Sequence, residues 1–495
     1  MKKQKLLLLK MVVPILLTSA IISCKKTSPV QETAHLPGKL KGNAASTVTG
    51  HPAGLQTNLR MFGYMSVYTS EYVKYMDSVN LAQLTDVAIA FINPDVNGVF
   101  TISNDIAQAV VKAHNLNVRV HMSIGGGGGP AYWDNLIKPA NRASVISNIR
   151  NVITTYDFEG VDVDLEGARI TSDYNGFMMQ LSDTLRQYSK LLSAALARYQ
   201  GNLLSADVYS RLDYLNAMVY DYTSSSPRSH SSLANFQYDF NFFKTKLPAA
   251  KLNMGVPAYA WEYNGNTPTT QISLKDILKQ YPDAYALNYK YPTPTKSWWY
   301  DGHPVLRQKV AYCLQQGVGG MMMWQIMHDP QDDASSLLKL MNFCAANPAL
   351  AGFDTSLNYS FTASNSWQVM EVANASLNNF AGVQQNIWTN GDHQKWFLSV
   401  TNNEFKITNK NSGKVLDEVD ETASGLGVQF VQNPWHGGGN QRYQFVPNEL
   451  GYYKLVNVAS TRLASVYQAS TTPGTKIVQW TDGNGANQQW VITRQ

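Results

Sequence analysis

Short apolar runs alternate with longer amphipathic stretches from about residue 58 to residue 350. Eight of these runs have the length and the β-branched or aromatic content of buried strands: 59–68, 86–93, 118–126, 159–166, 191–197, 214–222, 251–261 and 319–326. Stretches with helical periodicity, such as 104–115 and 174–192, lie between them. This alternation predicts an α/β fold, a (β/α)8 TIM barrel over residues 57–352. A doubly wound sheet is the alternative, but no GxGxxG follows the first strand and the eight-fold count favours closure.

The C-terminal part of the chain, residues 360–495, has few helical periods and many Gly, Asn and Gln residues. Three sets of residues recur in it at intervals of 47: Gln394, Gln441 and Gln488; Gln385, Gln432 and Gln479; Gly391, Gly438 and Gly485. The first set opens the triplets QKW, QRY and QQW. Three all-β units that cannot each close a core should pack around a pseudo-threefold axis. The repeat therefore predicts an all-β β-trefoil after the barrel, and the triplets resemble those of the ricin-type lectins, which are carbohydrate-binding domains.

The first 24 residues combine a basic start, MKKQK, with an apolar stretch that Lys10 and Pro14 interrupt. This stretch is too short for a stable membrane span and predicts a secretory signal peptide. It ends in IISC, which resembles a bacterial lipobox and implies a lipid anchor on Cys24 that holds the protein in a membrane. Lys25 stands where an inner-membrane-retaining Asp would be, which favours the outer membrane, on either its periplasmic or its cell-surface face. Residues 25–56, rich in Thr, Pro, Gly and Ala, predict a flexible tether.

Charge and cysteine content restrict the classes of partner and cofactor that we expect for this protein. The chain has 40 Lys and Arg residues against 35 Asp and Glu residues, but four of the lysines precede Cys24. The near-neutral remainder lacks the basic balance of a nucleic-acid-binding protein, and no His or Cys spacing indicates a metal site. We expect a monomer without cofactor or metal. Cys313 and Cys344 lie in apolar, helical stretches, which favours buried thiols, although an oxidising compartment would permit a disulfide.

Three carboxylates occupy alternate positions of the fourth run, FEGVDVDLEG: Asp162, Asp164 and Glu166. Alternate side chains of a strand share a face, so the acids should point into the barrel while the apolar residues between them face the helices. Burying three like charges is costly and must raise at least one pKa. Glu166 comes at the C-terminal end of the strand, where barrel active sites lie. A carboxyl group with a raised pKa at that end is suited to general acid catalysis.

Three interpretations of these acids compete. A solvated acidic loop conflicts with the strongly apolar residues between them. A Mg²⁺ site would need further acids at the ends of neighbouring strands, where only Asp221 and Asp329 are available. Glycoside hydrolysis with Glu166 as the acid is the favoured interpretation.

The run EGVDVDLE resembles the DxxDxDxE signature of family 18 glycoside hydrolases, which include chitinases, relatives that act on N-glycans, and sugar-binding proteins without the acid. Further motifs occur in the order of that family: Ser123-Ile124-Gly125-Gly126 (SxGG), Met218-Val219-Tyr220-Asp221 (MxYD), Gly255-Val256-Pro257 and the strand-eight tryptophan Trp324. Glu159 stands where the signature begins with Asp, and its spacing places it off the catalytic face. We interpret it as an acid-for-acid change.

The resemblance implies retaining hydrolysis in which the N-acetyl oxygen of the substrate is the nucleophile. Glu166 would protonate the glycosidic oxygen and later activate water. Asp164 would turn toward Glu166 and the acetamide N–H, and Asp162 would share a proton or charge with Asp164. Tyr220 and Asp221 would bind the acetamide group. We expect the following residues to contact substrate: Trp324, Met218, Ser123, Tyr64, Trp133 and Trp261.

In ricin-like units an early Asp, an aromatic residue and polar groups near the QxW triplet bind sugar. The second repeat has all of these and is the best candidate site: Asp417, Trp435, Asn440 and Gln441. The first repeat has Glu371 and Trp388 at the corresponding places, and the third has Ser465 in place of the acid. The alternative is that the QxW residues chiefly pack the trefoil core.

These features predict an endo-acting chitinase that hydrolyses β-1,4-linked N-acetylglucosamine polymers. Only 57 residues separate Trp261 from Gly319, so we expect little or no extra α+β module there and a shallow, open cleft. One alternative is an endo-β-N-acetylglucosaminidase acting on N-glycans. The other is a non-catalytic chitin-binding lectin of the cell surface, but such proteins usually lack the acid that Glu166 supplies.

Overall fold

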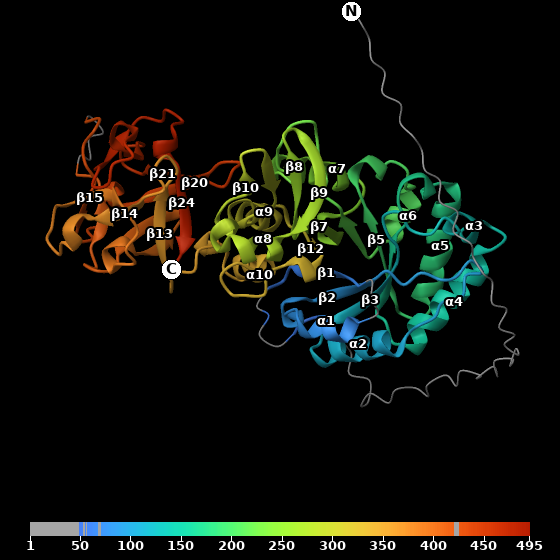
Figure 1. Ribbon diagram of the computed structural model, residues 1–495. Coiled ribbons are helices and arrows are strands. Elements are labelled where there is room, and N and C mark those ends of the chain that lie inside the picture. The colour runs from blue at the N-terminus through green and yellow to red at the C-terminus, as the bar shows by residue number, and fades with distance from the viewer. Residues whose placement is uncertain (1–48, 53–54, 56, 68–70, 420–424) are drawn as a thin grey trace, which may run out of the picture. The chain divides into compact units, whose positions relative to one another are not determined.

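The computed structural model describes residues 49–52, 55, 57–67, 71–419 and 425–495 (Figure 1). The signal peptide, Cys24 and most of the tether lie outside these residues. The last part of the predicted tether contacts the barrel, because the Thr49 N–H donates to Asn117 Oδ1 at 3.0 Å. Gly50 is buried against Arg119. Contacts with the barrel therefore begin before residue 57.

Eight parallel strands close into a barrel in the order β1-β12-β7-β6-β5-β4-β3-β2. They are β1 (Arg60–Ser66), β2 (Asp86–Ala90), β3 (Arg119–Gly125), β4 (Gly160–Asp164), β5 (Leu191–Leu196), β6 (Tyr214–Ala217), β7 (Leu252–Pro257) and β12 (Gly320–Trp324). Each falls within one of the eight predicted runs, and the run 214–222 is a strand only to Ala217. The predicted TIM barrel is confirmed.

Helices connect successive strands and pack around the barrel (Figure 1). They are α1 (Tyr72–Asp77), α2 (Asn104–Asn115), α3 (Trp133–Leu136), α4 (Arg142–Thr155), α5 (Ser172–Arg186), α6 (Ala206–Arg211), α7 (Leu233–Phe243), α9 (His303–Gln316) and α10 (Leu337–Ala346). Serines cap four of these helices by accepting the N–H of the residue three positions on: Ser103, Ser205, Ser232 and Ser336. Gly317 ends α9 at φ 64°, a conformation that favours glycine.

The strands bury both of their faces. Val161, Val163 and Leu165 pack outward into the layer between strands and helices. A second, smaller apolar cluster fills the barrel interior and includes Phe62, Tyr64, Ala88, Ala90, Ala195 and Met322. Asp162 and Asp164 of β4 face this interior, where polar side chains of other strands surround Asp162.

An antiparallel sheet and a helix are inserted between β7 and β12. The sheet has the order β10-β11-β8-β9, and its elements are β8 (Tyr259–Asn264), β9 (Thr267–Ser273), α8 (Leu274–Gln280), β10 (Tyr289–Thr293) and β11 (Lys296–Trp299). The prediction of little or no α+β module here is wrong. The prediction assumed that two connecting helices occupy part of the segment between β7 and β12. Only α9 connects the inserted unit to β12, so about forty residues remain for the insertion. The predicted shallow cleft loses its basis.

Residues 358–494 form an antiparallel all-β domain, which confirms the predicted trefoil. Its strands are β13 (Asn358–Ala363), β14 (Val369–Val372), β15 (Ala381–Asn386), β16 (Trp396–Thr401), β17 (Glu404–Asn409), β18 (Val415–Asp417), β19 (Val431–Asn433), β20 (Tyr443–Pro447), β21 (Tyr453–Asn457), β22 (Leu463–Val466), β23 (Ile477–Trp480) and β24 (Trp490–Arg494). The aromatic residues of the three triplets, Trp396, Tyr443 and Trp490, are fully buried in one core. The repeat therefore packs the centre of the domain.

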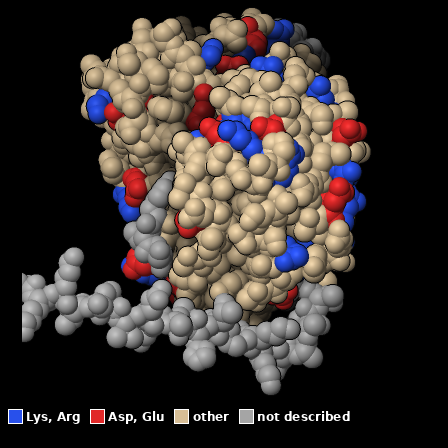
Figure 2. Space-filling model, turned by 90° about the vertical axis from the view of Figure 1, so that its right-hand side faces the viewer, with Lys and Arg blue, Asp and Glu red and all other residues tan. Residues whose placement is uncertain are grey.

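Three further observations bear on the sequence predictions. Cys313 and Cys344 are free and buried, as the helical stretches around them indicated. Among the described residues, no helix has both the length and the apolar character needed to cross a membrane. Figure 2 shows Lys and Arg mixed with Asp and Glu on the face that it draws.

Candidate active site

The three acids of the β4 run lie in a row that leads from the barrel interior to its C-terminal end. Asp162 is fully buried, Asp164 is 4% exposed, and Glu166, just beyond the strand, is half-buried. The alternation that the sequence predicted is therefore realised, and exposure increases along the row toward the C-terminal end of the barrel.

Asp162 accepts hydrogen bonds from four side chains of four different strands. Oδ2 accepts from Tyr64 Oη and Ser123 Oγ, each at 2.8 Å, and Oδ1 accepts from Ser193 Oγ at 2.7 Å and Asn216 Nδ2 at 3.0 Å. Four donors match an ionised carboxylate, which only accepts. This corrects two predicted substrate contacts, since Tyr64 and Ser123 are buried and point to Asp162 instead of the cleft.

Asp164 and Glu166 have the opposite character. Burial, then the charges of Glu166 and Asp162, raise the pKa of Asp164 well above its usual value. Oδ1 of Asp164 is buried and has no hydrogen-bond partner. Burial and the charge of Asp221 raise the pKa of Glu166, against the opposing charge of Arg169. A proton in this row is therefore held more readily by Asp164 or Glu166, whose pKa values are raised, than by the carboxyl group of Asp162 with its four donors.

Asp221 follows β6 and is held from several sides. Its Oδ1 accepts from Tyr259 Oη at 2.5 Å and from Trp261 Nε1 at 2.7 Å. Although burial raises the pKa of Asp221, the nearby imidazole of His230, whose Nδ1 lies 3.5 Å from Oδ1, and the hydrogen bonds from Tyr259 and Trp261 outweigh it and lower the pKa below the usual value. The charge of Asp221 therefore lies near Glu166 and favours the protonated form of that glutamate, and Trp261, from the inserted sheet, lies at the site as the sequence predicted.

An aromatic floor lies at the same end of the barrel. Trp324, the last residue of β12, stacks on Phe91 with ring centroids 5.9 Å apart and contacts Tyr64 at 5.5 Å. Met218 and Tyr220 pack against the same interior cluster and are half-buried. Burial, then the charges of Asp164, Asp221 and Glu166, raise the pKa of Tyr220 well above its usual value, which keeps its hydroxyl protonated. The site thus offers an apolar surface and a phenolic donor beside the acids.

The glycines after β3 allow the chain to approach the acids closely. Gly125 has φ 100°, and a Cβ there would lie 2.4 Å from the Asp164 carbonyl oxygen. Gly126 has φ 95°, and a Cβ there would lie 2.5 Å from the ring of Phe91. A Cβ at Gly127 would lie 3.2 Å from Glu166 Oε1. Gly125 and Gly126 therefore need glycine for space as well as conformation, whereas Gly127 has only the close approach to Glu166.

Trp133 is not part of the site. It is fully buried in α3, its ring packs on Phe177, and its Nε1 donates to Asn93 Oδ1 at 2.8 Å. The prediction that it binds substrate is wrong, because an apolar ring following a strand packs equally well under the helices.

Sequence reasoning missed several residues that support the site: Phe91, Ser193, Asn216, His230 and Tyr259. Alternation could have indicated two of them, since Ser193 precedes Ala195 on the inner face of β5 and Asn216 lies two and four residues before Met218 and Tyr220. Tyr259 and His230 carried no pattern, because they reach the site only through folding.

The described residues do not bring the acids proposed for the Mg²⁺ alternative together. Asp329 accepts from Ser336 Oγ and from the N–H groups of Leu337 and Leu338, at the start of α10. It therefore serves as a helix cap and not as a ligand beside Asp221.

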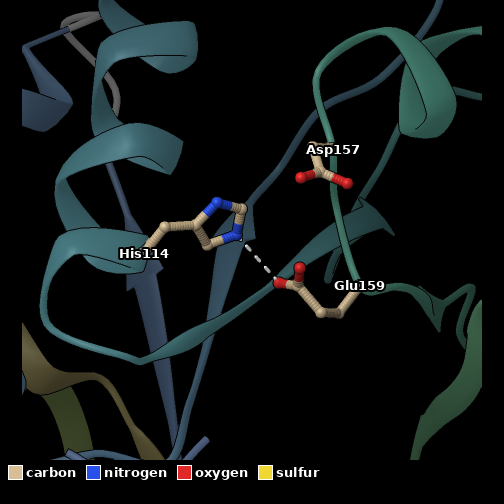
Figure 3. A group of neighbouring side chains, drawn as sticks. All are labelled: His114, Asp157 and Glu159. Atoms are coloured by element: carbon tan, nitrogen blue, oxygen red, sulfur yellow. Dashed lines mark hydrogen bonds and ion pairs between the residues drawn. The ribbon is translucent and has the colours of Figure 1, made fainter. Parts of the chain in front are cut away.

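A separate group lies at the other end of β4, where oxygen and nitrogen atoms of His114, Asp157 and Glu159 are within 4.8 Å of one another (Figure 3). His114 Nε2 is 3.0 Å from Glu159 Oε2, which also accepts from the Val120 N–H at 2.6 Å. Lys190 pairs with Asp157 at 3.2 Å. Glu159 thus ties α2 to the strands, away from the catalytic face, as its spacing predicted.

The predicted sugar site of the second trefoil repeat is only partly open. Asn440 Nδ2 and Gln441 Nε2 donate to the two oxygens of Asp417, at 3.0 Å and 2.7 Å, and all three residues are buried. Trp435 is 45% exposed, with Lys406 Nζ 5.3 Å from its ring centre. The same glutamine contact recurs in the other repeats, from Gln394 to Glu371 at 2.8 Å and from Gln488 to Ser465 at 2.9 Å. The glutamines therefore chiefly stabilise the fold, and Trp435 is the accessible member.

A TIM barrel with a row of acids leading to its C-terminal end, beside a phenol and an aromatic floor, is the arrangement of a glycoside hydrolase site. Residues 60–329, more than half of the chain, match the glycosyl hydrolases family 18. The chain belongs to this family. Residues 352–433 and 439–495 match the ricin-type beta-trefoil lectin domain-like family.

Individual relatives agree with this assignment. Endochitinase 1 of Metarhizium robertsii is 24% identical over 368 residues, which cover 58% of this chain and 85% of that protein. A class V chitinase of Arabidopsis thaliana is 28% identical over 279 residues, 46% of this chain and 73% of that protein. The crystal structure of the chitinase ChiB from the chitin utilization locus of Flavobacterium johnsoniae superposes with a TM-score of 0.53 at 28% identity, covering 59% of this chain and 96% of that one.

Proposed function

We propose that this protein is a chitinase that hydrolyses β-1,4-linked N-acetylglucosamine polymers with retention of anomeric configuration. The observation that carries the proposal is the contrast between the hydrogen-bond partners of the two acids of β4. Four donors hold Asp162 as an anion, whereas Asp164 has a raised pKa and an unpartnered Oδ1. A neutral carboxyl group at Asp164 can donate toward Glu166 and accept an acetamide N–H with its other oxygen.

The proposed mechanism is the one that the family resemblance implies, carried by these residues. Glu166 gives its proton to the glycosidic oxygen as the bond to the leaving sugar breaks. The acetamide oxygen of the substrate attacks the anomeric carbon and forms an oxazolinium-like ring, whose N–H faces Asp164. Water then adds to the anomeric carbon as the bond from that carbon to the acetamide oxygen breaks, and the water gives a proton to Glu166. Tyr220 donates to the acetamide oxygen, Asp221 orients the group, and Trp324 with Met218 supports the apolar face of the sugar.

Cleavage within the polymer is part of the proposal. It is supported by the endochitinases of Metarhizium, which match 58% of the chain. Because the inserted sheet is present, a short connection between β7 and β12 no longer supports internal cleavage. Trp261 of this sheet lies beside Asp221 at the site.

We infer that the trefoil holds the enzyme on polysaccharide through Trp435, whose ring is the exposed member of the second repeat. A lipid on Cys24 would anchor the protein in the outer membrane as a monomer. That inference rests on the lipobox-like sequence IISC.

Product analysis tests the activity. The full chain is incubated with chitin oligosaccharides and with a high-mannose glycoprotein, and products are followed by mass spectrometry and by ¹H NMR at early times. We expect short N-acetylglucosamine oligomers with β-anomeric ends from wild type and none from Glu166→Gln. Glu159→Gln is the matched control, because it changes the same functional group at the far end of β4 and should leave the rate unchanged.

Other outcomes would redirect the proposal. Glycan release from the glycoprotein alone would make the protein an endo-β-N-acetylglucosaminidase. Equal sugar binding by wild type and Glu166→Gln without any cleavage would make it a lectin. Release of only terminal disaccharides would contradict internal cleavage and leave the chemistry in place.

A further inference from the structure

His230 is a fully buried residue in the segment that follows β6. Its Nδ1 lies 3.2 Å from the N–H nitrogen of Asp221, and its Nε2 lies 3.2 Å from the carbonyl oxygen of Tyr259. A carbonyl only accepts and a backbone N–H only donates. Both contacts are therefore satisfied by one neutral tautomer, with the hydrogen on Nε2 and the lone pair on Nδ1.

The contact with Asp221 holds an unusual backbone. Asp221 has φ 65°, in the left-handed region that is unfavourable for a residue with a Cβ. The turn is also held by the Thr223 N–H, which donates to the Asp221 carbonyl at 2.8 Å. In this conformation the Asp221 N–H points at the imidazole, so His230 satisfies a donor that the strand ladder leaves unpaired.

Tyr259 contacts both His230 and the carboxylate of Asp221. The Tyr259 hydroxyl donates to Asp221 Oδ1 at 2.5 Å, while its carbonyl accepts from His230. The two rings also pack together, with centroids 5.1 Å apart. His230 thus links the backbone of Asp221 to the residue that holds its side chain.

The neighbouring contacts fix His230 itself. Its carbonyl accepts from the Tyr222 N–H at 3.0 Å. Ser231 Oγ donates to the Val219 carbonyl at 2.6 Å and accepts from Lys309 Nζ at 2.7 Å. Lys309 in turn forms a fully buried ion pair with Asp301. These bonds attach the segment to α9, which is part of the rigid barrel.

We propose that His230 is a positioning residue that sets the orientation of Asp221 toward the acetamide group of the substrate. The inference rests on the proposed function, since it assigns Asp221 to that group. A misplacement of about 1 Å at a reacting group can cost about a hundredfold in rate. A buried imidazole with two hydrogen bonds thus stabilises the turn at Asp221.

Two amide substitutions separate the two bonds of the ring. In His230→Asn the amide oxygen takes the place of Nδ1 and can still accept the Asp221 N–H. In His230→Gln the amide reaches the place of Nε2 and the acceptor at Nδ1 is lost. We expect His230→Gln to lower kcat on chitin oligosaccharides about tenfold or more with a smaller change in KM. His230→Asn should stay within about threefold of wild type, because only a neutral hydrogen bond is lost.

Ser231→Ala is the control for stability. It removes an anchor of the segment but keeps both hydrogen bonds of the imidazole, so it should lower Tm while reducing kcat less than His230→Gln does. All variants are assayed at a temperature at which circular dichroism shows them folded. If His230→Gln does not fold, His230→Ala replaces it, and imidazole added to fill the cavity should restore kcat.

Three results would overturn the inference. His230→Gln could keep the wild-type kcat, both amide variants could lose kcat equally, or imidazole could fail to rescue a folded His230→Ala. Failure of the proposed function is distinct from these, because wild type itself would then release no sugar.

Discussion

The indole nitrogen of Trp261 lies 2.7 Å from Oδ1 of Asp221, so a residue of the inserted sheet holds a carboxylate of the barrel. The insertion is therefore part of the site and more than a surface addition. Trp261→Phe keeps an aromatic ring and removes the hydrogen bond, one of the contacts that lower the pKa of Asp221. We expect the acidic limb of kcat/KM to move to higher pH, as measured from pH–rate profiles on a chitin oligosaccharide. An unchanged acidic limb would show that Asp221 does not titrate in the reaction.

The alkaline limb should report Glu166. A general acid must be protonated, and the pKa of an ordinary glutamate is about 4.3. Because the pKa of Glu166 is raised, activity should persist to higher pH than that value and fall as pH rises through the folded-state pKa. Arg169 lowers this pKa, so Arg169→Gln should move the alkaline limb to higher pH. Asp134→Asn is the control, since Asp134 pairs with Arg169 at 3.3 Å and its loss leaves the arginine charge in place. A downward shift in Arg169→Gln would contradict the assignment.

Asp164 should be a source of instability as well as activity. Its folded-state pKa lies above the unfolded value, so the native state binds more protons, and the free energy of unfolding falls as pH rises between the two values. Asp164→Asn removes this penalty. We expect the variant to gain stability relative to wild type between pH 5 and pH 8, in urea unfolding, while kcat falls about a hundredfold or more.

Asp162→Asn provides the opposite comparison. The amide of the variant has one accepting oxygen and one donating nitrogen, so the buried donors that bind the second carboxylate oxygen lose their acceptor. We expect the free energy of unfolding to fall by about 2 kcal/mol or more. If both variants were stabilised, the assignment of the anion to Asp162 would be wrong.

The trefoil should contribute binding to insoluble substrate alone. Trp435→Ala removes the exposed ring of the second repeat, and Trp388→Ala removes its counterpart in the first, which is 38% exposed. We expect Trp435→Ala to weaken binding to insoluble chitin about tenfold, as a central aromatic contact does, with kcat on soluble oligosaccharides unchanged. Trp388→Ala should have the smaller effect. Equal binding by wild type and both variants would remove these tryptophans from the binding surface.

The sequence by itself determined the barrel, the trefoil and the row of acids. Period-two alternation places Asp162, Asp164 and Glu166 on one face in any buried strand, and a repeat of 47 residues requires equivalent units. Both are local or periodic properties, and neighbouring residues along the chain suffice to specify them. The insertion shows the limit of such reasoning, because counting residues between Trp261 and Gly319 could not tell which helix belonged to the barrel.

Only the tertiary structure decided which acid is charged. Asp162 and Asp164 are the same residue type two positions apart, and they differ because Tyr64, Ser123, Ser193 and Asn216 converge on one and not on the other. Those donors come from four strands, β1, β3, β5 and β6, whose inward-facing side chains meet only when the barrel closes. The same holds for Trp133, which packs in the core, and for His230 and Tyr259, which reach Asp221. Protonation depends on the three-dimensional set of donors and charges around a group, and sequence spacing does not contain that set.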